Sequence, residues 1–286
     1  MTEICRIALG RDEPFDLDAT LGCGQAFRWE KTEDGWWHGV AGGRGIRIRQ
    51  DGSLLSFRGA DESFVRRYLA LDLDLPGILA SVDRDPVVHA AIDRCLGLRL
   101  LRQEPFETLI SYICATNANI PVIRKRVRLL AEGYGRPLPG GGHAFPTADE
   151  LASSTESSLR EGCVMGYRAP YVCRTAAMCV EDPTWAERTA ALPYEDARKE
   201  LLRFPGVGPK AADCILLFAF QKYEAFPVDV WIRRIMRRSY LPHLREEGAM
   251  TAKEYREIRD FAWEHFGRYA GWAQEYLYCV RDDRPV

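Results

Sequence analysis

The chain has 286 residues, of which 47% are hydrophobic and 28% are charged, with a formal net charge of −2 at pH 7. This composition is typical of a globular protein that buries a substantial core in two or three subdomains. It excludes a membrane-embedded protein, because no apolar run is long enough to span a bilayer. Because the net charge is close to zero, any binding of a polyanion must depend on local basic patches.

The nine cysteines are scattered between Cys5 and Cys279, with no C-x-x-C pair. An odd number of scattered cysteines argues against both a disulfide framework and a zinc site. We therefore expect free thiols and no bound metal. The chain begins MTEICRIALGRDE, which lacks the basic and apolar regions of a secretory signal, so we expect a reducing, intracellular location.

The first third of the chain has the pattern of an antiparallel sheet. Five short segments alternate hydrophobic and polar residues or are bounded by glycine turns, at 4–9, 26–30, 35–40, 45–49 and 54–58. Helical patterns follow at 61–69 and 86–95, and we expect both helices to pack on the sheet. From about residue 100 onward there is essentially no strand pattern. The predicted fold class is α+β, with a β-rich subdomain at 1–98 and a mostly helical core at 99–286.

Three glycine-containing or polar breaks separate these elements. Gly24 lies between two strand patterns in the run GCGQAFRW, where a glycine can form a turn or let the backbone approach a flat ligand. Asn117 lies in the break after a buried helix pattern that starts at Pro105, and an asparagine there can simply cap the next helix. Tyr167 and Arg168 stand just before another helix pattern, where a buried core position is the simplest interpretation of the tyrosine.

The stretch LLRFPGVGPKAADCILLFAF at 201–220 organises the second half of the chain. A helical pattern ends before the proline- and glycine-rich run, which forbids helix, and a strongly apolar helix pattern begins at Lys210. This is the pattern of a helix-hairpin-helix, which we place at about 196–220. Gly206 and Gly208 have no Cβ, so their N–H groups can approach a phosphate beside the positive end of a helix dipole.

Two charged residues near the hairpin have the placement of reactive groups. Lys210 starts a helix that is apolar nearly all round, an unusual neighbour for a lysine, whose uncharged amine is a nucleophile. The alternative is a lysine that extends to solvent or pairs with a phosphate. Asp229 directly precedes a third helix pattern, where an isolated aspartate is most often a plain N-cap.

Two basic runs are candidates for contact with a polyanion. Such runs are most often solvated helix faces. The run that adjoins the hairpin is the stronger candidate for binding nucleic acid. The members of the first run are Arg124, Lys125, Arg126 and Arg128, and those of the second are Arg233, Arg234, Arg237 and Arg238.

The lysine and the aspartate, separated by one buried helix and one loop, together resemble the signature of the helix-hairpin-helix, Gly/Pro-rich loop, aspartate superfamily of DNA glycosylases. Within it, the segments PGVGPKAADCI and PVDVW and three distant segments resemble the 8-oxoguanine DNA glycosylases over most of the chain. The resemblance implies a monomeric, bifunctional DNA glycosylase and AP lyase that removes 8-oxoguanine from double-stranded DNA in base excision repair. It implies no metal or organic cofactor. In a prokaryote such an enzyme would be cytoplasmic and associated with the nucleoid.

Some members of the superfamily carry an iron–sulfur cluster that is held by four closely spaced cysteines after the catalytic helices. Here that region offers only Cys279, so we expect no cluster.

The resemblance gives roles to the residues that react and to those that contact the strands. Lys210 would attack the sugar carbon C1′, and Asp229 would stabilise the positive charge that develops there. Asn117 would lie in the gap left by the flipped nucleotide and contact the unpaired cytosine. Tyr167 would wedge beside the opposite base, to which Arg168 would donate hydrogen bonds.

Further residues would read the flipped base. The carbonyl of Gly24 would accept a hydrogen bond from the N7–H that 8-oxoguanine has and guanine lacks. Gln274 would pair with the Watson–Crick edge, and Tyr278, one turn later on the same helix face, would stack on the ring. Cys214 and Phe218 would line the opposite wall. Core packing is the alternative interpretation of these residues.

The sequence departs from the animal members of the family at two positions. Val122 stands where those relatives have an arginine, and Trp231 stands where they have a histidine next to the DNA backbone. Because valine has no donor, Arg168 alone would contact the opposite cytosine, and we expect only a modest preference for that base.

Two other interpretations stay open. One is a superfamily enzyme with another lesion preference, such as an alkylated base or an oxidised pyrimidine. The other is a helix-hairpin-helix DNA-binding module without catalysis, which the presence of both Lys210 and Asp229 disfavours.

Overall fold

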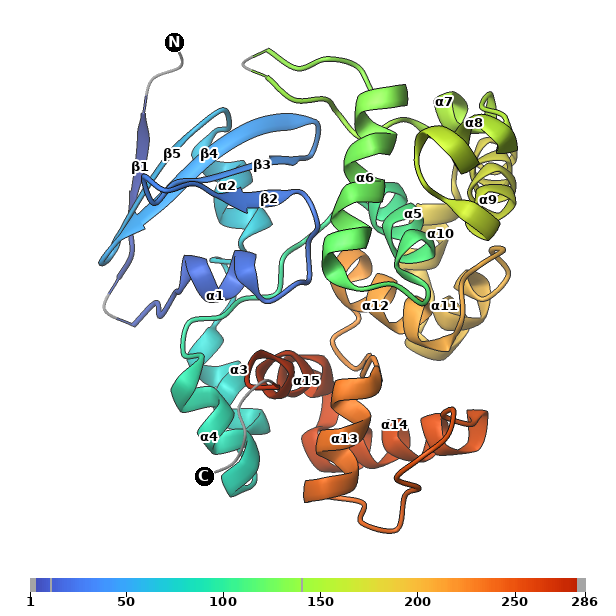
Figure 1. Cartoon of the computed structure of the whole chain (residues 1–286). Helices are drawn as coiled ribbons and strands as arrows, with labels where there is room; N and C mark the ends of the chain where they lie inside the picture. The colour runs from blue at the N-terminus through green and yellow to red at the C-terminus, as the bar shows by residue number, and fades with distance from the viewer. Residues whose placement is uncertain (1–3, 11, 140, 282–286) are drawn as a thin grey trace.

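The structure, a computed structural model, describes residues 4–10, 12–139 and 141–281. An antiparallel sheet near the N-terminus lies beside a larger helical body, which confirms the predicted α+β class (Figure 1). The sheet has the strand order β1-β5-β4-β3-β2. Its strands are β1 (Cys5–Ala8), β2 (Trp29–Lys31), β3 (Trp37–Ala41), β4 (Arg44–Asp51) and β5 (Leu54–Arg58). All five predicted strands are therefore present, with small differences at their ends.

The helices follow in chain order. The first six are α1 (Leu17–Gly22), α2 (Glu62–Tyr68), α3 (Leu75–Val82), α4 (Pro86–Arg94), α5 (Pro105–Ala115) and α6 (Ile120–Tyr134). Then come α7 (Ala148–Ala152), α8 (Glu156–Gly162), the short 3-10 helix η1 (Gly166–Arg168), α9 (Ala169–Glu181), α10 (Trp185–Ala191) and α11 (Tyr194–Leu201). The last are α12 (Pro209–Phe220), α13 (Val230–Ser239), α14 (Ala252–Phe266), the 3-10 helix η2 (Gly267–Tyr269) and α15 (Ala270–Cys279). No described helix is long and apolar enough to cross a membrane.

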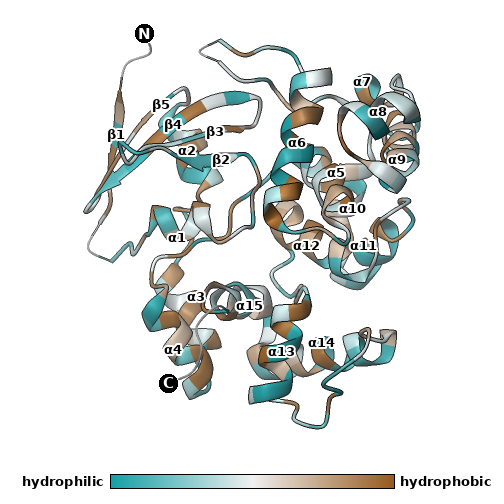
Figure 2. Ribbon diagram, in the orientation of Figure 1, coloured by the Kyte–Doolittle hydropathy of each residue, from teal (hydrophilic) through white to brown (hydrophobic). Residues whose placement is uncertain are grey.

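The sheet buries one face and exposes the other. In the register of β1 with β5, Ile7 is opposite Leu55, and in that of β4 with β5, Ile48 is opposite Phe57; all four side chains are buried. Helix α2 packs in the same apolar cluster through Phe64, Val65 and Tyr68. Figure 2 shows the resulting alternation of hydrophobic and hydrophilic residues along the strands and helices. This alternation is expected for elements with one buried face.

Strand β2 begins three residues later than the pattern suggests because the chain before it is bonded elsewhere. The side chain of Gln25 donates to the carbonyls of Thr20 and Arg99 and accepts from the N–H of Leu101. The Gln25 carbonyl in turn accepts from the side chain of Gln103. These bonds hold the segment that contains Gly24 against the start of the helical body instead of the sheet.

The prediction that the helix at 86–95 packs on the sheet is wrong. The apolar side chains of α3 and α4 belong to the core of the helical body, and both helices pack against α15, as Figure 1 shows. Side-chain bonds fix this placement, since Asp85 at the start of α4 accepts from Tyr240 and His265, and Tyr276 donates to the carbonyl of Leu98. The division of the chain at residue 98 stays a prediction.

Helix α12 is the central element of the helical body. Every residue from Ala211 to Phe220 is buried, as the apolar pattern predicts. The helix ends at Gln221, whose φ of 51° is the left-handed conformation that often terminates helices. This enclosure fixes the helix backbone, and with it the point from which a side chain on the first turn extends.

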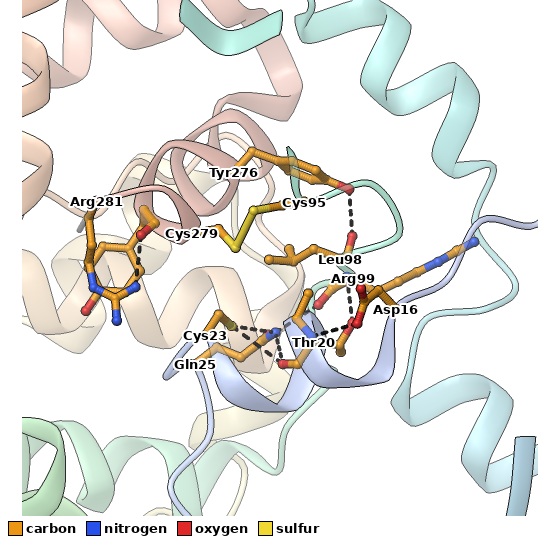
Figure 3. The surroundings of a disulfide bond; sticks show 12 residues. Asp16, Thr20, Cys23, Gln25, Cys95, Leu98, Arg99, Tyr276, Cys279 and Arg281 are labelled. Atoms are coloured by element: carbon orange, nitrogen blue, oxygen red, sulfur yellow. Dashed lines mark hydrogen bonds between the residues drawn. A yellow bond between two sulfur atoms is a disulfide. The ribbon is translucent and has the colours of Figure 1, made fainter. Parts of the chain in front are cut away.

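The prediction that all nine cysteines are free thiols is wrong for one pair. Cys95, at the end of α4, and Cys279, the last residue of α15, form a disulfide (Figure 3). The fold brings together two residues that are 184 positions apart in sequence, with their Cα atoms 6.8 Å apart, and no local spacing signals such a pair. The other seven cysteines are free, and burial raises the pKa of the Cys114 thiol to about 12.

Candidate active site

A cleft of about 850 Å³ opens where the α5–α6 loop, the first turns of α12 and α13, and α15 meet the segment around Gly24. Most of the residues that the sequence singles out line it, although they come from all parts of the chain. They are Gly24, Asn117, Gly208, Lys210, Cys214, Phe218, Asp229, Trp231, Gln274 and Tyr278. Gly206, Tyr167 and Arg168 are not among the lining residues.

The predicted helix-hairpin-helix is formed by α11, a tight turn and α12. Gly206 has a φ of 85°, and a Cβ at this position would come within 3.0 Å of Tyr171 and 3.2 Å of Ile113. The turn therefore needs a glycine for both its backbone conformation and its packing. Gly208 is the N-cap of α12, and it has no side chain that could cover the N–H groups at the start of that helix. A Cβ at Gly208 would have no atom within 4 Å, so the space beside these N–H groups is open.

Lys210 lies in the first turn of α12 and is half-buried. Its Nζ is 4.9 Å from the centroid of the Tyr112 ring, which is within the range of a cation–π interaction. This contact places the amine beside Tyr112, which also lines the cleft. Cys214, one turn later, is fully buried, and this burial raises the pKa of its thiol to about 11, while the nearby Lys210 acts in the opposite direction. Within the cleft the lysine therefore lies beside an aromatic ring and a neutral thiol.

Asp229 caps α13, as the sequence predicts. Its Oδ1 accepts from the N–H groups of Trp231 and Ile232, each at 2.9 Å. Because Oδ1 takes both bonds, the carboxylate is fixed at the N-terminus of α13. Lys210 and Asp229 thus face the same cleft from the first turns of two different helices.

A buried network behind these two residues was not predicted from the sequence. Asp213, which is completely buried in α12, accepts hydrogen bonds from Tyr194, Arg198 and Tyr255. Burial raises the pKa of the Asp213 carboxyl, and the Arg198 guanidinium opposes that shift. Tyr255 also accepts from the N–H of Val228, so the network links α12 to the residue before Asp229. The only sequence signal was an aspartate within a run of apolar residues.

The wall formed by α12 and α15 has the features of a flat, polar-edged pocket. The ring of Phe218 stacks on Tyr112, with centroids 6.1 Å apart and planes 13° apart. Gln274 is 4% exposed, and its Oε1 accepts no hydrogen bond from the described residues. A buried amide oxygen without a partner is costly unless a ligand supplies the donor.

Gly24 faces the same pocket from the other side. Its φ is 103°, and a Cβ there would lie 2.7 Å from Cδ1 of Ile120. A side chain at this position would therefore both strain the backbone and collide with the start of α6.

The two asparagines of the α5–α6 loop have different functions. Asn119 is the cap of α6 and accepts from the N–H of Val122. Asn117 is in the left-handed region, with φ of 48°, and its side chain donates to the hydroxyl of Tyr167 at 3.2 Å. The predicted alternative, in which Asn117 itself caps the helix, does not describe this loop, and Asn117 lies at the cleft.

Tyr167 and Arg168 differ in exposure. Tyr167 is 48% exposed, so it is not the core tyrosine of the simpler interpretation, whereas Arg168 is only 4% exposed. The guanidinium of Arg168 lies over the Tyr167 ring and donates to the carbonyls of Thr116 and Asn117. In this structure Arg168 therefore holds the loop that carries Asn117.

The two basic runs are only partly solvated. Arg126 is buried and donates to the carbonyls of Cys114 and Val164, and Arg233 pairs with Glu254 at 2.6 Å. Arg234 and Arg238 are exposed on α13, and the guanidinium of Arg234 lies 5.0 Å from the ring centre of Trp231. The exposed positive charge beside the cleft is thus smaller than the sequence suggested.

Two known protein families match most of the chain. The description "8-oxoguanine DNA glycosylase, N-terminal domain" matches residues 6–109, and "HhH-GPD superfamily base excision DNA repair protein" matches residues 110–260. The chain belongs to the HhH-GPD superfamily of base excision DNA repair proteins. Its lysine, its aspartate and its hairpin are therefore parts of a DNA repair fold.

Relatives of this repair protein share nearly its whole length. An N-glycosylase/DNA lyase of Saccharomyces cerevisiae is 32% identical over 96% of this chain and 85% of its own. The N-glycosylase/DNA lyase OGG1 of Arabidopsis thaliana is 30% identical over 92% of this chain and 76% of its own. The crystal structure of Clostridium acetobutylicum 8-oxoguanine glycosylase/lyase in complex with double-stranded DNA containing cytosine opposite 8-oxoguanine has a TM-score of 0.86. That protein is 35% identical, with 93% of this chain and 91% of that chain covered.

In the described part of the chain, no three histidine, cysteine, aspartate or glutamate side chains are grouped so that they could hold a metal ion.

Proposed function

We propose that the protein is a bifunctional DNA glycosylase and AP lyase that excises 8-oxoguanine from double-stranded DNA. The observation that carries this proposal is the cleft itself. It presents the amine of Lys210 and the carboxylate of Asp229 beside a pocket with a buried, unpartnered Gln274 and stacked aromatic rings. A nucleophile and a pocket for a flat, polar-edged ring are the two parts that removal of a base requires.

The damaged nucleotide must leave the duplex first, because C1′ cannot be reached within the stack. Unstacking costs a few kcal/mol, and side chains that occupy the vacated space offset part of this cost. Asn117 and the exposed ring of Tyr167 are hydrogen-bonded to each other next to the cleft and are suited to this position. The turn at Gly206 and Gly208 presents backbone N–H groups at the start of α12, where a DNA phosphate would be held.

The chemistry then needs only side chains. The Lys210 amine attacks C1′ as the base departs, and the Asp229 carboxylate stabilises the positive charge that develops on the sugar. The sugar ring opens to give a Schiff base with Lys210, and β-elimination from this intermediate breaks the strand. No step requires a metal ion or an organic cofactor.

Recognition of the base follows from the walls of the pocket. Gln274 pairs with the Watson–Crick edge, Tyr278 and Phe218 border the ring, and Cys214 lies between Lys210 and Phe218 on α12. The carbonyl of Gly24 accepts from the N7–H that distinguishes 8-oxoguanine from guanine. For guanine the same contact would place two acceptors together, which costs a few kcal/mol.

Substitution of Gly24→Ala is expected to lower single-turnover excision of 8-oxoguanine by about tenfold or more, because the strained backbone moves the reading carbonyl. Gly22→Ala is the matched control, since a Cβ at that position meets only Trp37 at an ordinary 3.8 Å. Equal excision rates for the two variants would show that Gly24 does not take part in base recognition.

The base opposite the lesion is expected to matter only modestly. Val122 is exposed and its side chain has no donor, and Nε and Nη2 of Arg168 are already bonded to backbone carbonyls. The penalty for a wrong opposite base should therefore not exceed one charged hydrogen bond, about 1–3 kcal/mol. Single-turnover rates on the four duplexes test this. A preference for cytosine above roughly a hundredfold, or ~2.7 kcal/mol, would show that another residue replaces the missing arginine.

A superfamily enzyme with a different lesion preference is the main alternative. Incubation of the wild-type protein with duplexes that carry 8-oxoguanine, an alkylated base or thymine glycol separates the possibilities. We expect excision of 8-oxoguanine to dominate, and a preference for another lesion would overturn the substrate assignment. If the protein binds these duplexes but excises none of the three lesions, it is a DNA-binding module without catalytic activity.

We also propose that the enzyme acts as a monomer, and that in a prokaryotic host it works in the cytoplasm on nucleoid DNA. A dimer in solution at the concentration used for the assay would contradict the first part.

A further inference from the structure

The cleft contains a second carboxyl group that the reaction described above does not use. Glu275 follows Gln274 on α15, lines the cleft and is 4% exposed. Its Oε2 has no hydrogen-bond partner among the described residues. Other buried carboxyl groups of this chain are satisfied, since Glu254 pairs with Arg233 and Asp213 accepts from three donors. Glu275 is therefore a buried acid whose Oε2 has no partner and which borders the reacting groups.

The surroundings of Glu275 allow it to hold or release a proton near neutral pH. Burial raises the pKa of its carboxyl to about 7, the facing Cys23 thiol and the Arg281 guanidinium lower it, Asp229 raises it, and Lys210 lowers it. Figure 3 shows Cys23 at the end of α1, immediately before the segment of Gly24. The titratable or charged groups that face Glu275 are Cys23, Tyr112, Lys210, Cys214, Asp229, Tyr278 and Arg281.

The glycosylase step requires a proton to move across this cleft. When the uncharged Lys210 amine forms its bond to C1′, its nitrogen becomes positively charged and must lose a proton before a Schiff base can form. The departing base takes the electron pair of the glycosidic bond and must gain a proton. Asp229 is bonded to the start of α13 and is needed as an anion beside the sugar.

We propose that Glu275 carries this proton. In its acid form it protonates the departing base, and the resulting carboxylate accepts the proton that the Lys210 nitrogen must lose. The glycosidic bond breaks, the bond between the lysine nitrogen and C1′ forms, and Glu275 returns to its acid form, so the step needs no further reactant. The proposal rests on the function proposed above, because it assumes attack by Lys210.

The test is the pH dependence of single-turnover excision by the wild type and by Glu275→Gln. Glutamine keeps the size of the side chain but cannot carry a proton. Dividing the two rates removes the effects of groups that both proteins share. We expect the wild type to be faster by about a hundredfold at about pH 6 and by only about threefold at about pH 8.5, because deprotonation above about 7 removes the acid form.

A matched control separates proton transfer from a structural role. Cys23→Ala removes the thiol that faces Glu275 but keeps the carboxyl group, so it should retain most of the rate advantage at about pH 6. A Cys23→Ala variant as slow as Glu275→Gln, or a rate ratio that does not change with pH, would mean that Glu275 only positions the segment before Gly24. A loss of lesion affinity that accounts for the whole rate loss would mean that it only binds the base.

Failure of this proposal is distinct from failure of the proposed function. If Glu275→Gln excises as fast as the wild type at every pH, the protein is still a glycosylase, but Glu275 does not carry the proton. If the wild type itself excises no 8-oxoguanine, the function fails. If Glu275→Gln does not fold, Glu275→Ala is compared with the wild type in the same way, and a rate ratio that does not change with pH contradicts the proposal.

Discussion

We expect Lys210→Gln to abolish the covalent adduct that borohydride traps on 8-oxoguanine duplex and to lower excision by more than about a thousandfold, while the duplex is still bound. Glutamine has no nucleophilic amine, so neither the bond to C1′ nor the Schiff base can form. Because α12 is buried along nearly its whole length and Lys210 itself is half-buried at its edge, the substitution should not unfold the helix. Trapping and single-turnover excision measure the two effects.

Lys199→Gln is the matched control for this experiment. Lys199 lies on α11 of the same hairpin, is exposed, and pairs with Asp196. It should trap and excise as the wild type does. An undiminished adduct in Lys210→Gln would show that another amine is the nucleophile.

We expect Asp229→Asn to lower the excision rate by about a hundredfold to a thousandfold and to leave lesion affinity largely unchanged. The charge of the carboxylate matters most as positive charge develops on the sugar, so its removal should affect the rate more than binding. Asparagine is also a good N-cap, so the bonds to Trp231 and Ile232 can largely persist. Equilibrium binding and single-turnover rates on the same duplex separate the two effects.

Asp61→Asn is the control for loss of charge at a cap. Asp61 caps α2 by accepting from Phe64 at 2.8 Å and does not line the cleft. This variant should keep full activity. If Asp229→Asn lost binding and rate equally, or melted far below the Asp61 variant, Asp229 would have a structural role only.

The places of Lys210 and Asp229 in the fold could be predicted because local sequence determines them. A proline- and glycine-rich turn followed by an apolar run fixes Lys210 at the first turn of a buried helix, and an aspartate before a helix pattern fixes Asp229 as a cap. The strands were predictable for a similar reason, since alternation along a strand depends on which face is buried.

Features that depend on contacts between distant segments could not be predicted. The partner of Cys95 is 184 residues away, and the placement of α3 and α4 depends on α15 at the other end of the chain. The inward orientation of Arg168 depends on the carbonyls of the α5–α6 loop. Whether an arginine is solvated or buried likewise depends on its tertiary neighbours, as the pairing of Arg233 with Glu254 shows.

The most direct test of the central claim is to map the site of covalent attachment in the wild-type protein. The protein is incubated with an 8-oxoguanine duplex and borohydride, digested, and analysed by mass spectrometry for the peptide that carries the reduced sugar fragment. We predict that the adduct lies on Lys210 and that it is absent when guanine replaces the lesion. An adduct on another residue, or none on a duplex from which the base has been removed, would contradict the assignment of Lys210 as the nucleophile.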